Sequence, residues 1–235
     1  SPATEAVCTA RSTPASTSGD VVFADQQAFI IEHAMLAAAT LGDPAVETRA
    51  RAALDVLVQR AYARGWGVRH TVGGAQPLSG TTPPGLLQDQ VQVASACLAA
   101  HQLTGERRYL DAAIAYGDAL LGKQSERGYW QTGYAGRIYL ADTGSALGLF
   151  IVLYPHVDET RRGKYRAATQ RYVDAIERDG LIRPSGALDV GLRNDASGAA
   201  TVPYNQDYTT SSSLTGGEIF TWMYHATGKE KYRDI

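Results

Sequence analysis

Two aspartates, Asp89 and Asp142, are the residues whose type and spacing best suit a chemical role. Each stands near the start of a predicted helix in successive hairpins, so their carboxyl groups are predicted to project toward one cavity. A carboxyl group that gives and takes a proton, with a second carboxylate nearby to raise its pKa, suits acid/base work such as glycoside hydrolysis. The alternative is structural, because an aspartate at a helix start also caps free backbone N–H groups. Asp25 occupies the equivalent place in the first hairpin, which fits the structural alternative, and it is also a candidate substrate-binding residue.

Aromatic and basic side chains gather in the loops that follow the first two hairpins. Trp66, Arg69 and His70 lie in the first loop, and Trp130 and Tyr134 lie in the second. Aromatic faces stack on sugar rings, and an arginine can pair with the carboxylate of a uronic acid. The sequence therefore predicts these five as substrate-binding residues. The alternative for the two tryptophans is that they fill the gap between hairpins as core residues, and the glycine close before each one favours that alternative.

No pattern typical of a metal or cofactor site occurs in the sequence. The five histidines are scattered, and neither Cys8 nor Cys97 has the close Cys or His spacing of a zinc site. Glycine-rich phosphate loops and a GxSxG motif are also absent. We therefore expect neither a metal nor an organic cofactor. A Cys8–Cys97 bridge and a free, buried Cys97 are both open, and the second is favoured because Cys97 lies within a predicted helix.

A repeated turn reveals the elements that must position these residues. The phrase TGERRY at 104–109 recurs as TGKEKY at 227–232, an offset of 123 residues, or two units of about 61. A degenerate copy, LGDP, begins at Leu41, and the remaining unit passes through RGKY at 162–165. A fixed period of tens of residues indicates stacked supersecondary units. Each turn lies between two amphipathic helical patterns, and its glycine is predicted to end the first helix in the left-handed conformation.

This unit predicts helices at 24–41, 45–63, 89–103, 108–122, 142–154, 159–179 and 209–226. The fold class is therefore all-α, an (α/α) toroid of which about three and a half of six hairpins are present. Alanines concentrated on the helices of the second hairpin are predicted to let neighbouring helices approach closely. Residues 21–235 would form this hairpin domain, incomplete at its C-terminus, and residues 1–20 a flexible lead-in rich in Ser, Thr, Pro and Ala.

The phrase LLQDQ at 86–90, followed by the TGERRY turn, resembles the six-hairpin glycosidase-like superfamily of (α/α)6 sugar-active enzymes. Residues 23–134 resemble the helical-barrel portion of bacterial thioredoxin-domain proteins of the spermatogenesis-associated type. Residues 86–232 are also similar to unsaturated glucuronyl hydrolases, in which two inner helices begin at catalytic-site aspartates. That second resemblance implies a general acid/base role for Asp142 and a substrate-orienting role for Asp89.

A later segment extends the likeness to the hydrolases. Tyr208 and the polar run that follows it resemble the sugar-contacting loop and helix of that family, which implies that Tyr208 binds substrate. The first functional hypothesis is therefore a hydrolase acting on a uronic-acid-containing oligosaccharide, unsaturated in the family that it resembles. The second is a non-catalytic helical scaffold that binds glycan or protein. The third is a sugar isomerase or epimerase, disfavoured because the predicted inner-helix starts carry aspartates instead of histidines.

The composition of the chain limits the kinds of partner that it can bind. Twenty-two basic and 24 acidic residues give a formal net charge of −2 without long runs of either sign, so nothing recruits nucleic acid. The longest apolar stretch, residues 147–154, is far shorter than the ~20 residues of a membrane span. The Ser/Thr/Pro-rich start favours a secreted or periplasmic protein, with the cytoplasm as the alternative.

Overall fold

The computed structural model describes residues 22–63, 67–72, 86–130, 137–194, 201–204 and 209–234. The chain forms two compact units, Ser1–Ala119 and Leu120–Ile235. The predicted hairpin domain therefore comprises two units, and their boundary falls within a helix.

Helices dominate the described ranges, as predicted. The α-helices are α1 (Ala24–Leu41), α2 (Pro44–Ala61), α3 (Leu87–Thr104), α4 (Arg107–Leu121), α5 (Leu140–Leu153), α6 (Glu159–Arg178) and α7 (Thr209–Thr227). Two 3-10 turns, η1 (Tyr154–His156) and η2 (Glu230–Tyr232), complete the set. Every predicted helix is present, with ends within two residues of the predicted ones. In the described part of the chain, no helix is both long and apolar enough to span a bilayer.

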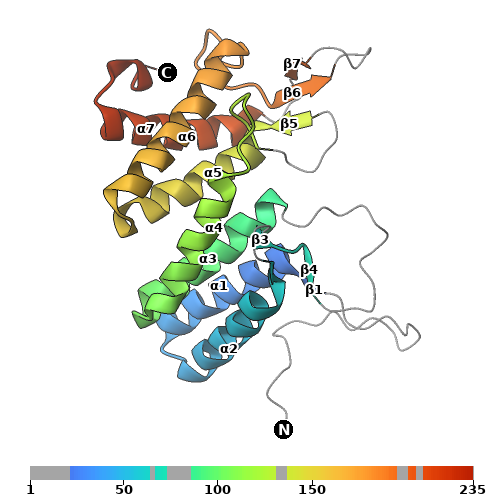
Figure 1. Ribbon diagram of the computed structural model, residues 1–235, viewed down its shortest axis with the longest axis vertical. Coiled ribbons are helices and arrows are strands. Elements are labelled where there is room, and N and C mark those ends of the chain that lie inside the picture. Colours follow the sequence, from blue (N-terminus) through green and yellow to red (C-terminus); the bar gives the residue numbers. More distant parts are fainter. Residues whose placement is uncertain are drawn as a thin grey trace, which may run out of the picture. The chain divides into compact units, whose positions relative to one another are not determined.

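Short antiparallel strands, which the sequence analysis did not predict, lie in the connections. In the first unit, β1 (Val22–Phe23) pairs with β4 (Thr71–Val72), and β2 (Tyr62–Ala63) pairs with β3 (Gly67–Val68). In the second unit, β5 (Arg137–Tyr139), β6 (Gly191–Asn194) and β7 (Thr201–Tyr204) form one sheet in that order (Figure 1). Strands of two to four residues are too short to produce a periodic pattern of apolar residues, so the sequence does not predict them.

The repeated turn has the predicted backbone conformation. Gly105 ends α3 with φ 72°, and its N–H donates to the carbonyl of His101 at 2.7 Å. The corresponding glycines of two other copies, Gly42 and Gly228, have φ of 70° and 68°. The prediction is wrong for the fourth copy, because Gly163 of RGKY lies inside α6 and ends no helix. A residue with a Cβ atom adopts this region at a cost, which explains why glycine recurs there.

The tyrosine of the turn attaches each hairpin to the second helix of the hairpin before it. Tyr109 is 2% exposed and donates its hydroxyl to Asp55 of α2 at 2.9 Å. In the second unit, Tyr232 is equally buried and donates its hydroxyl to Gln170 of α6. The turn phrase recurs because it makes an equivalent contact in each unit.

Small residues set the close packing within the first unit, where α1 packs against both α2 and α3 (Figure 1). The buried alanines of α3 and α4 are Ala94, Ala96, Ala99, Ala100 and Ala113. Side chains of this size let helix backbones approach closely, as the sequence predicted. Cys97 lies among them as a free, buried thiol.

Replacing Gly105 by alanine tests the role of the turn. The positive φ is strained for any residue with a Cβ atom, so Gly105→Ala is expected to lower the free energy of unfolding by about 1 kcal/mol, measured by urea denaturation. Gly163→Ala is the matched control. Gly163 lies inside α6 with open space around its Cβ position, so alanine there is expected to raise stability by about 0.5 to 1 kcal/mol. Equal effects of the two variants would contradict the assignment.

Candidate functional site

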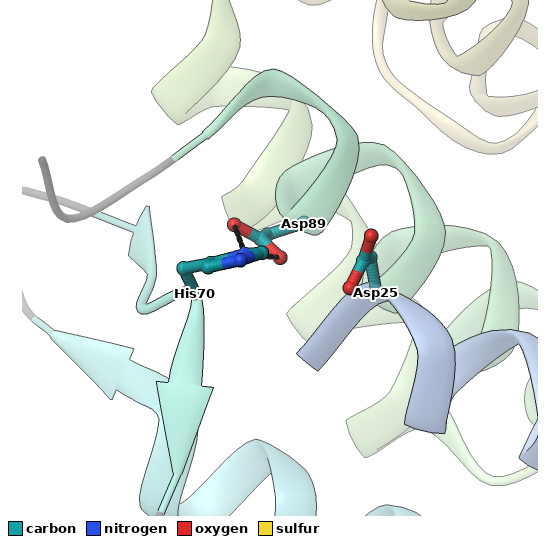
Figure 2. A group of neighbouring side chains, drawn as sticks. All are labelled: Asp25, His70 and Asp89. Carbon is teal, nitrogen blue, oxygen red and sulfur yellow. Dashed lines mark hydrogen bonds and ion pairs between the residues drawn. The ribbon is translucent and has the colours of Figure 1, made fainter. Parts of the chain in front are cut away.

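Three side chains from separate segments of the first unit meet at one point. Asp25 comes from the first turn of α1, His70 from the segment between β3 and β4, and Asp89 from the first turn of α3 (Figure 2). The imidazole Nδ1 of His70 lies 3.1 Å and 3.2 Å from the two carboxylate oxygens of Asp89. One polar atom from each of the three residues lies within 4.8 Å of the other two. The structure thus brings together three of the residues that the sequence analysis selected.

Backbone contacts hold His70 in this place. The carbonyl of His70 accepts a hydrogen bond from the N–H of Ala24, the first residue of α1, at 2.9 Å. The preceding N–H, that of Arg69, donates to Ala61 at the end of α2 at 2.8 Å. The rings of Phe23 and His70 also touch, with centroids 5.1 Å apart. The segment is therefore fixed to both helices of the first hairpin.

None of the three aspartates is the N-cap of its own helix, although Asp89 accepts a hydrogen bond from the backbone of Asp25 at the start of α1. The N-cap residues of α1, α3 and α5 are Phe23, Leu86 and Tyr139, and none makes a side-chain capping bond. By contrast, α2 and α6 begin with true aspartate caps, since Asp43 accepts from two backbone N–H groups and Asp158 from one. Capping thus falls to aspartates just before α2 and α6, which leaves those inside the first turns of α1, α3 and α5 available for other contacts.

Burial gives Asp89 an unusual proton affinity. Its side chain is fully inaccessible to solvent, and this desolvation raises the pKa of its carboxyl group from 3.8 to about 6. The contact with His70 and a hydrogen bond from the backbone of Asp25 lower this pKa, while the charge of Asp25 raises it. Because burial is the largest cause, the group changes its protonation close to neutral pH.

Asp25 contributes a carboxylate with one unpartnered oxygen. Its Oδ1 is buried and has no hydrogen-bond partner among the described residues. Two carboxylates and an imidazole could also ligate a divalent cation. However, His70 Nδ1 is directed at both oxygens of Asp89, so the geometry is that of a hydrogen-bonded pair, and a cation would require this ring to turn away.

The structure describes only some of the other predicted site residues. Arg69 is exposed and stands next to His70. Asp142 lies in the first turn of α5, where burial raises the pKa of its carboxyl group. It belongs to the second unit, so its pairing with Asp89 stays a prediction. The candidates Trp66, Tyr134 and Tyr208 lie outside the described residues.

Trp130 occupies a core position. Its side chain is 1% exposed, and its indole N–H donates to the carbonyl of Leu120 at 2.8 Å. The rings of Phe150 and Tyr172 pack against it at 5.9 Å and 6.4 Å. Its faces are therefore covered by other side chains, and no face is left on which a sugar could stack.

The contact between His70 and Asp89 had no signal in the sequence. The two residues are 19 positions apart, across a connection without helical periodicity. The sequence analysis selected each one separately, His70 as a loop residue and Asp89 as a helix start. The short strands that fold the connection back onto α1 are what join them.

No protein-family profile and no curated protein sequence matches this chain. Solved structures do match it. D-Mannose isomerase has a TM-score of 0.70 at 16% identity, over 91% of this chain and 57% of its own. The cellobiose 2-epimerase of Spirochaeta thermophila has a TM-score of 0.63 at 16% identity, over 91% and 56%. An unsaturated glucuronyl hydrolase from Bacillus sp. GL1 has 0.61 at 15% identity, over 88% and 59%.

These similarities establish the fold. All three structures are (α/α)6 enzymes of the glycosidase-like class, so this chain has the helical-hairpin fold of that class, as the resemblance in the sequence predicted. The chain spans between 56% and 59% of the length of these structures.

The raised pKa of Asp89 predicts a pH-dependent stability. The folded chain keeps the proton up to about pH 6 and the unfolded chain loses it near 3.8, so this group's contribution to stability falls as pH rises between these values and then levels off. Asp89→Asn does not titrate, so its free energy of unfolding relative to the parent should increase by up to about 3 kcal/mol across this window. Urea denaturation at several pH values measures it.

Asp158→Asn is the control with the opposite sign. Hydrogen bonding to the backbone of Arg161 lowers the pKa of Asp158, so its stabilising contribution is lost as pH falls. The other titratable groups facing Asp89 are His70 and Asp25. A parent-to-variant difference for Asp89→Asn that is flat between pH 4 and 6 would contradict the assigned burial.

Proposed function

We propose that this chain is part of a carbohydrate-active enzyme in which the buried Asp89 and the partly exposed His70 together transfer protons to and from an oligosaccharide. The observation that carries the proposal is the fully buried Asp89 carboxyl group in contact with His70, and burial raises the pKa of this group to about 6. A general acid or base works best when its pKa lies close to the working pH, because both protonation states are then populated.

His70 makes the proton transfer repeatable. Its side chain is 23% exposed, so it reaches solvent on one side and Asp89 on the other. An imidazole exchanges protons readily near neutral pH. Because Asp89 is inaccessible to solvent, its proton reaches the substrate through His70 and returns by the same route. Asp25 is half-buried, and its carboxylate offers a hydrogen-bond acceptor for a sugar hydroxyl.

The reaction that we propose is hydrolysis of a uronic-acid-containing oligosaccharide. Where the terminal uronic acid is unsaturated, its double bond is a vinyl ether that a carboxylic acid can protonate. Water then adds to the resulting cation to give a hemiketal, and the proton that the water loses returns to the carboxylate. The hemiketal ring opens and leaves a hemiacetal at the anomeric carbon, whose breakdown cleaves the glycosidic bond and releases the shorter oligosaccharide. The exposed Arg69 beside the site supplies a cation for the uronate carboxylate. The resemblance in the sequence implied the acid/base role for Asp142 and an orienting role for Asp89. We propose the acid/base role for Asp89 instead and keep Asp142 as the second carboxyl group.

A second candidate is isomerisation or epimerisation of a sugar. The sequence argued against it because no histidine was expected at the predicted inner-helix starts. The structure places His70 against Asp89 through a connection instead of a helix. A base that removes a proton from carbon and an acid that returns it are what such a reaction needs, and an imidazole beside a carboxyl group can provide both. Two of the similar structures are a sugar isomerase and a sugar epimerase.

Asp89→Asn tests the proposed acid/base role. Turnover of an unsaturated uronide, followed by the loss of ultraviolet absorbance of its double bond, is expected to fall by about 10²- to 10⁴-fold while the circular dichroism spectrum is unchanged. Asp142→Asn is expected to abolish turnover as well. Asp43→Asn is the matched control, because it makes the same change at a helix start that only caps α2, and asparagine caps equally well. An Asp89→Asn variant as active as this control would rule out the role.

The competing functions separate in deuterated water. An isomerase or epimerase that works through proton removal from carbon places deuterium on the sugar ring or chain, which proton NMR detects as a lost C–H signal. A hydrolase leaves the reducing-end C–H groups of the product unlabelled and releases a shorter oligosaccharide. A binding scaffold shows neither change and keeps its affinity in Asp89→Asn. We expect cleavage without labelling of a reducing sugar.

A further inference from the structure

Gln90, the neighbour of Asp89 on α3, makes a pair of hydrogen bonds with the backbone of the segment that carries His70. Its amide oxygen accepts from the N–H of Val68 at 2.8 Å, and its amide nitrogen donates to the carbonyl of Val68 at 2.9 Å. One side chain thus satisfies both backbone groups of a single residue, as a neighbouring strand would do. We propose that Gln90 is a positioning residue, which sets the contact between His70 and Asp89 by holding Val68.

Burial makes these two bonds consequential. Both Gln90 and Val68 are 0% exposed, so water cannot replace either partner. Removing the amide leaves a buried N–H and a buried C=O of Val68 without partners, and such groups are costly to desolvate. The segment would then move until its backbone groups reach water. His70 is two residues further along, so it would move with them.

Gly67 supplies the room for this contact. A Cβ atom at position 67 would lie 2.0 Å from the amide oxygen of Gln90, which is far inside van der Waals contact. Its φ of +83° also favours glycine. The contact between Gln90 and Val68 therefore depends on Gly67 as well as on Gln90, and a substitution at either position should break it.

Gln90 and Asp89 act on the same segment at different points. Asp89 binds the imidazole of His70, whereas Gln90 holds the backbone two residues earlier. The rise of the helix fixes the distance between these two side chains, so the geometry of the imidazole against the carboxylate follows from the backbone contact. The importance of this geometry for turnover rests on the proposed function, but the positioning itself does not.

The test is the tautomer of His70, read from the nitrogen shifts of its imidazole by NMR at about pH 8.5, where an ordinary imidazole is neutral. In the parent, Nδ1 faces a carboxylate, so the proton is expected on Nδ1. An imidazole that has lost this partner divides between the two tautomers. Gln90→Met keeps the length of the side chain without its hydrogen bonds, and it should reduce the Nδ1–H form to a minority. The His70→Gln variant assigns the signal.

Two further variants keep the test decisive. Gly67→Ala breaks the same contact from the other side and is expected to shift the His70 tautomer in the same direction. Gln124→Met is the matched control: Gln124 also donates its side-chain amide to backbone carbonyls, those of Gly128 and Ala168, but in the second unit. It should leave the His70 signals unchanged. Should Gln90→Met not fold, Gln90→Glu takes its place, because it keeps an acceptor for Val68 but not the donor.

The outcomes separate positioning from function. Retention of the parent tautomer in both Gln90→Met and Gly67→Ala would overturn the proposal, whatever the activity. A shifted tautomer supports it, even if no sugar is turned over. Where turnover of an unsaturated uronide is measurable, Gln90→Met should lower kcat by about 10²-fold through misplacement of the site, with KM changed less. A parent protein without turnover counts against the proposed function alone.

Discussion

An isolated helical hairpin cannot bury its own apolar faces, so in each unit the helices depend on contact with their neighbours. The turn between helices makes this contact specific, because its buried tyrosine packs back toward the preceding hairpin, as Tyr109 does by bonding Asp55. Small alanines then let the helix backbones come close. With the helices fixed in this way, the connection between α2 and α3 has a defined place to fold against, beside the start of α1.

The candidate site forms where the N-terminal ends of helices lack hydrogen-bond partners. The first N–H groups of a helix lack partners within it, and α1 and α3 begin without capping side chains. In α1 these groups find partners outside the helix: the N–H of Ala24 donates to the carbonyl of His70 in the connection, and the backbone of Asp25 binds the carboxylate of Asp89 in α3. The cost of burying Asp89 appears as its raised pKa, which the contacts with His70 and with the backbone of Asp25 partly offset.

The sequence predicted the features that are local and missed those that join distant segments. Helix bounds and the left-handed Gly105 follow from periodicity and from glycine chemistry, which a short window contains. His70 was chosen as a loop residue, with no means of knowing that two-residue strands would carry it to Asp89. The role of Gln90 was not predicted, because no sequence pattern indicates that a glutamine on a helix binds a backbone group 22 residues away. Trp130 shows the reverse, since the glycine before it favoured the core position that it occupies.

The bond from Ala24 to His70 ties the local stability of a helix end to the integrity of a site. The terminal turns of helices ordinarily fray, opening and closing far more often than the chain unfolds. Here the first amide of α1 cannot open without releasing the carbonyl of His70, and the backbone of the next residue, Asp25, contacts Asp89. The state in which the amides at this end exchange slowly with solvent is therefore the state in which the site is assembled. A molecule that loosens the end of α1 would separate the three side chains without contacting any of them.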